Sequence, residues 1–258
     1  MDYEQIEVED RDEIRLITLN RPEKLNAWTP RMQMELVATI EEGNATTSVG
    51  AFVVTGAGRA FCAGADIGAV FGSQLDEGPG EAQREAERVD WVGLMRESKP
   101  IVAAINGASI GVGLTLTLSM DFLVARPDAK LSARFVKMGV VPELASSSFL
   151  VHRCGWGNAS DLSLSGRTVL GTEAHELGLV DEVAEDVVEA AIARAASYAE
   201  NAPPSVQLTK GLLTANASEA DLGEVQRREM EALRVAYATD EHREAVNAFM
   251  EKRPPKFR

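Results

Sequence analysis

A single acidic residue, Glu143, lies in an otherwise uncharged stretch where it could transfer protons. Residues 139–151 read GVVPELASSSFLV, and Glu143 is the only charged residue among them. Apolar surroundings raise the pKa of a carboxyl group and make its ionised form a better base near neutral pH. A second interpretation stays open, because Pro142 is typical of a helix start, where an acid interacts favourably with the helix dipole. Glu143 is therefore either a catalytic base or a solvent-facing acid at a helix start.

Two segments rich in small residues could donate backbone N–H groups to a negatively charged oxygen. FCAGADI (61–67) and NGASIGVGLTL (106–116) each follow an apolar run that predicts a buried strand, and each leads into a predicted helix. N–H groups at such helix starts point towards an anion or a polarised carbonyl oxygen. A tight turn needs the same residue types, so one segment alone is weak evidence. Two segments together indicate paired donors for one oxygen.

The elements that must position these residues predict an α/β core followed by a helical region. Residues 72–84, rich in Gly, Pro, Gln and acids, predict a mobile surface segment. From about Val187 onward the pattern is helical, with a break at 201–205. Strands are expected at 14–19, 50–56, 99–107 and 122–127. Helices are expected at 30–42, about 85–97 and around 149–150. Residues 166–183 predict a turn, a short helix and a final strand.

Composition narrows the class of partner. The net charge of −14 and the pI near 4.8 argue against nucleic acid or an anionic membrane as the main partner. No stretch is apolar enough to cross a bilayer, and the acidic N-terminus lacks an apolar signal core, which predicts a cytoplasmic protein. Cys62 and Cys154 are too few and too far apart for a disulfide framework or a metal cluster, so no metal is expected.

Taken together, these stretches resemble the crotonase (enoyl-CoA hydratase/isomerase) superfamily nearly from end to end. Each motif is moderately specific, whereas their order and spacing make the resemblance strong. The matching stretches are NRPEKLNAW (20–28), TGAGRAFCAGADI (55–67), KPIVAAINGASIGVGLTLTLSMD (99–121), GRTVLGTEAHELGLVDEV (166–183) and AVNAFMEKRPPKF (245–257).

The resemblance implies a fold, an assembly and a substrate class. It implies a spiral of ββα units over residues 1–195 with the acyl-CoA site, and a helical oligomerisation region over 196–258 that forms a homotrimer or a dimer of trimers. The substrate would be a coenzyme A thioester, with no separate cofactor. Its carbonyl oxygen would accept hydrogen bonds from the N–H groups of Ala65 and Val112, where loss of one donor costs about 3 kcal/mol of transition-state stabilisation. Val112 stands where the family usually has glycine.

The sequence departs from the hydratase pattern at both acidic positions. Hydratases of this family usually carry two glutamates, and the matching residues here are Thr115 and Phe135. Adding water across a double bond requires a group that holds the water and removes its proton. Threonine is a poor general base near neutral pH, and phenylalanine cannot act as one. Ordinary hydration is therefore hard to explain.

Glu143 instead matches a branch with Δ3,Δ2-enoyl-CoA isomerase activity, in which a PEG.SS-like segment supplies one catalytic glutamate. Leu144 replaces the glycine of that pattern. Isomerisation needs one carboxylate, which removes a proton at C2 and returns it at C4. Two alternatives stay open: a hydratase or other enolate-forming enzyme that uses Thr115 or an acid such as Asp76 or Glu77, and a non-catalytic acyl-CoA-binding protein.

Further residues are predicted to bind substrate. The resemblance places the backbone of Ala63, Gly64 and Ile67 near the adenine, while Asp66 is interpreted mainly as a helix cap. Gly111 belongs to the second turn that would hold the thioester oxygen. Predicted contacts of the coenzyme A phosphates are Arg21 and Lys24 in the N-terminal loop, and Lys252 and Lys256, which could act across a subunit boundary.

Overall fold

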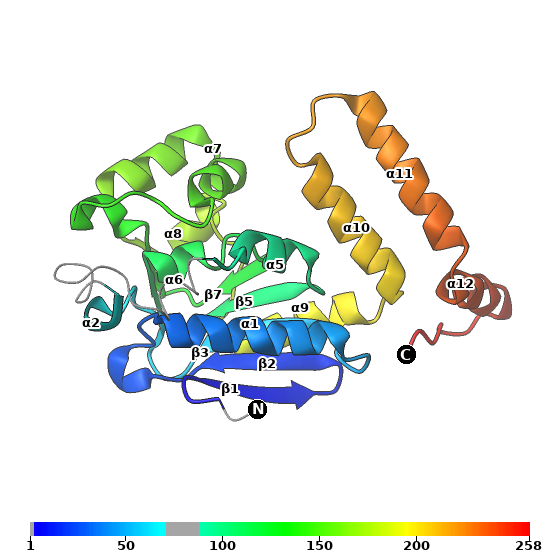
Figure 1. Cartoon of the computed structure of the whole chain (residues 1–258), viewed down its shortest axis with the longest axis horizontal. Helices are drawn as coiled ribbons and strands as arrows, with labels where there is room; N and C mark the ends of the chain where they lie inside the picture. The colour runs from blue at the N-terminus through cyan, green and yellow to red at the C-terminus, as the bar shows by residue number, and fades with distance from the viewer. Residues whose placement is uncertain (1–2, 71–87) are drawn as a thin grey trace.

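The computed structural model describes residues 3–70 and 88–258, which alternate between strands and helices until a helical C-terminal region (Figure 1). The strands are β1 (Ile6–Arg11), β2 (Ile14–Leu19), β3 (Ala51–Gly56), β4 (Ala60–Cys62), β5 (Ile101–Ile105), β6 (Ala108–Ile110), β7 (Phe122–Ala125), β8 (Lys130–Ser132), β9 (Val169–Leu170) and β10 (Glu182–Val183). The helices are α1 (Pro30–Ala45), α2 (Ile67–Val70), α5 (Trp91–Glu97), α6 (Val112–Thr115), α7 (Ser146–Ser165), α8 (Gly171–Glu176), α9 (Val187–Ala199), α10 (Pro203–Asn216), α11 (Leu222–Tyr237) and α12 (Asp240–Glu251), with short 3-10 helices η1 (Pro22–Lys24) and η2 (Arg134–Met138).

The strands form two sheets that the chain visits in turn. Within the described residues one sheet has the order β1-β2-β3-β5-β7-β10 and the other has the order β4-β6-β8-β9. β3, β5 and β7 are parallel neighbours in the first sheet, and β4, β6 and β8 are parallel neighbours in the second. Each pair of consecutive strands therefore advances the chain by one position in both sheets. This is the predicted spiral of ββα units, and the α/β fold class is confirmed.

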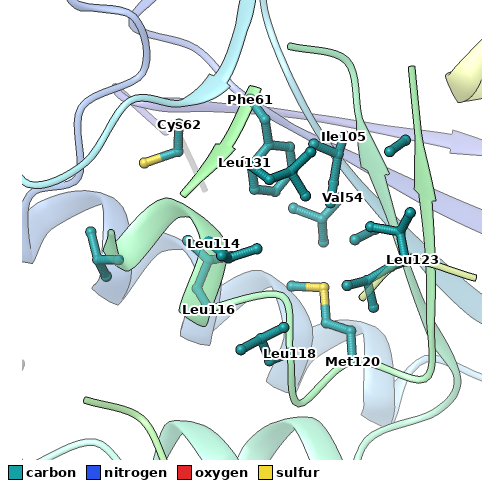
Figure 2. Close-up of a cluster of buried hydrophobic side chains, with 14 of the residues drawn as sticks. Val54, Phe61, Cys62, Ile105, Leu114, Leu116, Leu118, Met120, Leu123 and Leu131 are labelled. Carbon is teal, nitrogen blue, oxygen red and sulfur yellow. The ribbon is translucent and has the colours of Figure 1, made fainter. Parts of the chain in front are cut away.

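Both faces of the larger sheet are buried. Successive strand residues point to opposite faces, so each strand contributes side chains to both buried clusters. Small residues of α9, among them Ala191 and Ala195, cover one face. The other face meets the core between the two sheets, which Figure 2 shows closed by Phe61, Leu131 and the segment from Leu114 to Met120. Val53, Val102 and Val124 face α9, whereas Val54, Ala103 and Leu123 face the core between the sheets.

Two predicted helix limits differ from the structure. The first helix was expected to end before Gly43, yet α1 continues to Ala45, because Gly43 lies so close to β3 that an added Cβ would be 2.5 Å from the Phe52 ring. The ammonium group of Lys99 donates to the carbonyls of Gly43, Thr46 and Val49 at 2.7–2.9 Å and caps this end. The helix expected from about residue 85 begins at Trp91. Its start is set by the Asp90 carboxylate, which accepts a hydrogen bond from the N–H of Gly93.

The C-terminal helices extend away from the sheets as an arm, which we define as α10 to α12 (Figure 1). α10 is tied to the body by a buried ion pair of 2.7 Å between Lys210 and Asp121. α11 contains no buried residue. The boundary expected between residues 195 and 196 falls inside α9, which packs on the sheet as far as Ala199. Apolar residues exposed on the arm are Leu213, Leu222, Met230, Leu233, Val235, Tyr237, Val246, Phe249 and Met250.

No helix in the described part of the chain combines the length and the apolar character needed to cross a membrane. Across residues 3–70 and 88–258, no three His, Cys, Asp or Glu side chains gather as a candidate metal site. The segment predicted to be mobile, 72–84, lies outside the described residues, as do Asp76 and Glu77.

Candidate active site

The parallel pairing of β4 with β6 brings the two small-residue turns together. Cys62 of β4 is paired with Ser109 of β6. Ala65 follows Cys62 by three residues, and Val112 follows Ser109 by three residues. Because parallel strands end at the same edge of a sheet, the two turns leave the second sheet side by side. The register of one strand pair thus places both predicted donors.

Glycine at position 113 allows this close approach. A Cβ atom added to Gly113 would lie 2.1 Å from the carbonyl oxygen of Cys62, a distance that no side chain can occupy. Gly111 has a different role, since its φ of 57° and ψ of −122° are those of a turn position that glycine prefers. This turn starts α6, whose Leu114 and the following Leu116 anchor it in the core (Figure 2).

Changing Gly113 to alanine should lower the free energy of unfolding by about 1–3 kcal/mol, because the new methyl group forces α6 away from β4. The loss should appear in urea denaturation, together with reduced catalytic activity. Gly157→Ala in α7 is the matched control, since an added Cβ there meets nothing within 4 Å. Equal stability of the two variants would contradict the close-packing argument.

The N–H groups of Ala65 and Val112 are available to a ligand. Trp28 bridges the first turn: its N–H donates to the Gly64 carbonyl, and its own carbonyl accepts from Asp66, both at 2.8 Å. The N–H of Ala65, between these two, therefore points away from Trp28. Val112 is the first residue of α6, where N–H groups have no partner within the helix. Neither N–H has an acceptor among the described residues.

Glu143 lines the same pocket as Ala65 and Val112. The pocket has a volume of about 590 Å³ and is largely apolar. Trp28 and Trp91 form part of its wall, with ring centroids 5.8 Å apart in an edge-to-face arrangement. Three segments that are distant in the sequence thus bring a carboxylate and two unpaired N–H groups to one cavity.

The Glu143 carboxylate has no hydrogen bond or ion pair with any described residue. Glu143 is an exposed residue, although neighbouring protein atoms displace part of the water around its carboxyl group. This partial burial raises the pKa of Glu143 above its usual value of 4.5. Glu143 therefore combines an exposed side chain with a partly desolvated carboxyl group.

The backbone after Glu143 adopts an unusual conformation. Leu144 and Ala145 have φ values of 52° and 54°, in the left-handed region that glycine occupies most readily. This geometry explains why the PEG.SS-like isomerase segment has glycine at the position of Leu144. Leu144 packs against the core and lines the pocket, which offsets part of the backbone cost. The sharp bend ends the loop directly before α7, which begins at Ser146.

The residues at the two hydratase positions are apolar or turned inward. Thr115 is fully buried in α6, and its hydroxyl donates to the Val112 carbonyl at 3.4 Å. It lies behind the pocket wall, so its predicted contact with substrate is not supported by its position. Phe135 is 7% exposed and lines the pocket. Neither side chain supplies a second acid.

Arg21 connects the loop that follows β2 to the turn that follows β4. Its guanidinium donates to the Asp66 carboxylate at 2.9 Å and to the Ala27 carbonyl at 2.7 Å. Asp66 therefore takes part in an ion pair beside the Ala65 turn, and Arg21 is already engaged there. Lys24 is exposed in η1 and lies outside the pocket lining.

The other predicted phosphate contacts lie far from the pocket within one chain. Lys252 follows α12 and Lys256 is close to the C-terminus, at the opposite end of the molecule from α2 (Figure 1). Any contact with coenzyme A would have to come from the arm of another copy. Ala63, Gly64, Ile67 and Gly111, which were predicted to bind substrate, line the pocket.

Cys62 belongs to the core and not to the reacting groups. Its side chain is fully buried in the cluster of Figure 2. Burial raises the pKa of its thiol to about 11, so the thiol remains protonated and unreactive near neutral pH. Cys62 therefore acts as a packing residue of the core.

Sequence reasoning missed several pocket residues, among them Trp28, Trp91 and Arg134. The tryptophans lie in loop and helix segments without a local signal for a binding site. Arg134 directly precedes Phe135 and could have been found only by asking which neighbours of the hydratase positions reach the pocket.

Comparisons with known proteins agree with this architecture. The sequence profile described as enoyl-CoA hydratase/isomerase matches residues 9–258. A Mycobacterium bovis protein named "Probable enoyl-CoA hydratase echA8" is 33% identical over 259 residues, covering 100% of this chain and 99% of the relative. The 2,3-dehydroadipyl-CoA hydratase of Escherichia coli is 30% identical over 254 residues, or 97% of each chain. The crystal structure of an enoyl-CoA hydratase from Bacillus anthracis superimposes with a TM-score of 0.89 at 30% identity, covering 98% of this chain and 99% of that one.

The spiral of ββα units, with two backbone donors at one pocket, places this protein in the crotonase superfamily. Within that class, the chain belongs to the enoyl-CoA hydratase/isomerase family.

Proposed function

We propose that the protein is a Δ3,Δ2-enoyl-CoA isomerase that works with one glutamate. The observation that supports this most is the convergence of Glu143 with the unpaired N–H groups of Ala65 and Val112 on one pocket. The substrate is a coenzyme A thioester whose acyl group carries a double bond between C3 and C4. Coenzyme A is part of the substrate, and no separate cofactor takes part.

The reaction proceeds in two proton transfers. The Glu143 carboxylate removes a proton from C2, and the electron pair of that C–H bond moves into the thioester to form a dienolate. The N–H groups of Ala65 and Val112 donate to the enolate oxygen and stabilise its charge. Protonated Glu143 then returns its proton to C4, and the double bond lies between C2 and C3. The apolar walls formed by Trp28 and Trp91 limit access of water to the intermediate.

Activity should depend on the ionisation of Glu143. Because its pKa is raised above 4.5, the base is protonated and inactive at low pH, and kcat/KM should increase with pH through an inflection above 4.5. Following the absorbance of the conjugated thioester across a pH series gives this profile. An inflection at or below 4.5 would contradict a partly desolvated base.

Hydration of a 2-enoyl-CoA is the second candidate, because the relatives are named as hydratases. It requires a second polar group that holds and activates water. Thr115 is buried and its hydroxyl donates a hydrogen bond to the Val112 carbonyl, and the side chain of Phe135 has no polar atom. An acid from the segment 72–84, which lies outside the described residues, would have to replace the missing glutamates. A protein that binds acyl-CoA but catalyses neither reaction would be the non-catalytic alternative.

We also propose a homotrimer or a dimer of trimers in the cytoplasm. The exposed apolar residues of the arm, including Phe249 at 83% and Leu222 at 77%, support an assembly that covers them. The cytoplasmic location remains a prediction from the sequence. Sedimentation velocity measures the assembly, and a monomer at micromolar concentration would contradict it.

A further inference from the structure

Arg134 is the one cation among the described lining residues of the pocket, and the proposed chemistry does not use it. It is the first residue of η2 and lines the same cavity as Glu143. Its side chain is exposed and makes no hydrogen bond or ion pair within residues 3–70 and 88–258. Among the described lining residues, Arg134 and Glu143 are the two that carry a charge.

The two charges do not neutralise each other. No ion pair joins Arg134 to Glu143, and burial, with no charged neighbour contributing, accounts for the raised pKa of Glu143. A guanidinium in contact with the carboxylate would have lowered that pKa. The cavity therefore has a base at one place and a separate cation at another, with Met138, Val140 and Val141 lining the same wall.

Such a cation suits an anionic group on the ligand. A guanidinium presents paired N–H donors that match the two oxygens of a carboxylate, and few polar groups in an apolar pocket usually fix the orientation of the ligand. The chain as a whole carries a net charge of −14, whereas Arg134 adds a positive charge to the pocket lining. Arg134 lines the same cavity as Glu143, so in the proposed reaction it shares this cavity with the acyl group.

We propose that Arg134 binds a carboxylate at the far end of the acyl group, so that the enzyme prefers acyl-CoA substrates derived from dicarboxylic acids. This inference rests on the proposed function for the position of the acyl group. Phosphates of coenzyme A offer the same anionic chemistry and are separated from the carboxylate in the experiment below.

The test compares two 3-enoyl-CoA substrates of equal length, one ending in a methyl group and one in a carboxylate. The measured quantity is the ratio of their kcat/KM values. Arg134→Leu should lower the preference for the carboxylate by about tenfold or more, the effect of one hydrogen-bonded charge. Lys137→Leu is the matched control, because it removes a positive charge from the same η2 helix at a residue outside the pocket lining. An equal ratio in wild type, Arg134→Leu and Lys137→Leu would overturn the inference.

Repeating the assay with pantetheine thioesters, which lack the nucleotide phosphates, shows whether Arg134 binds the acyl carboxylate or a phosphate of coenzyme A. If Arg134 binds the acyl carboxylate, Arg134→Leu lowers the ratio with both carriers. If the variant weakens both acyl groups on coenzyme A equally and neither on pantetheine, Arg134 binds a phosphate and the proposal is wrong.

A binding measurement keeps this inference separate from the isomerase proposal. Saturated acyl-CoAs of six carbons, with and without the terminal carboxylate, are titrated into wild type and Arg134→Leu by calorimetry. A preference of the wild type for the carboxylate that is lost in Arg134→Leu supports the inference even if the protein turns over no 3-enoyl-CoA. Equal affinities in the wild type would overturn it even if isomerisation is observed.

Discussion

Replacing Glu143 by glutamine should lower kcat for isomerisation of a 3-enoyl-CoA by about 10²- to 10⁴-fold, the usual contribution of a general base. The amide has nearly the same size and shape as the carboxylate, so the pocket and the thioester site remain. It cannot accept the proton from C2 at neutral pH. Because both proton transfers use this one side chain, no other described residue of the pocket can replace it.

The control for this change is Glu176→Gln, which removes an exposed acid from α8 outside the pocket and should keep full activity. Glu143→Gln should also be at least as resistant to heat as the wild type, since a neutral amide is less costly than a carboxylate at a partly desolvated position. Loss of activity with unchanged folding therefore indicates lost chemistry. Retention of more than about half of kcat would show that Glu143 is not the base, because general-base catalysis contributes far more.

Replacing Val112 by proline should lower kcat by about 10²- to 10³-fold, the effect of removing one donor from an oxyanion site. Proline has no N–H, and its ring fills the space into which that N–H points. The change is compatible with the fold because Val112 is the first residue of α6, where proline is favoured. The preceding residue is Gly111, which has no Cβ for the proline ring to contact.

Val112→Ala keeps the N–H while shortening the side chain, and it serves as the matched control. It should retain activity within about threefold, whereas Val112→Pro should not, because only the proline variant loses the donor. Circular dichroism and urea denaturation check that both variants fold. If Val112→Pro folds and keeps its activity, the thioester oxygen does not bind at this turn.

The sequence pattern predicted most of the larger sheet but none of the short strands β4, β6 and β8 of the second sheet. β3 and β5 were found because strands buried on both faces are continuously apolar. β1 was missed because it is an edge strand with charged, exposed residues, and only its antiparallel pairing with β2 identifies it. The final strand expected in 166–183 is β10, whereas the two-residue strand β9 is defined by its pairing with β8.

The candidate site could be predicted where backbone chemistry restricts the residue type. Small residues at the turns of Ala65 and Val112 follow from the close approach of β4 and α6, which excludes a side chain at position 113. The position of Glu143 beside these turns depends on tertiary packing, so the resemblance supplied what the local pattern did not. Arg134 and the inward orientation of Thr115 became apparent only from the three-dimensional arrangement.

The most direct test of the central claim offers the purified protein a 3-enoyl-CoA and, separately, the matching 2-enoyl-CoA. The first assay follows formation of the conjugated 2-enoyl thioester, and the second follows its loss by hydration. A site with Glu143 as the one acid among its described lining residues, and with Thr115 and Phe135 at the hydratase positions, predicts isomerisation without hydration. Rapid hydration, or hydration that persists in Glu143→Gln, would contradict the one-glutamate mechanism and show that another group activates water.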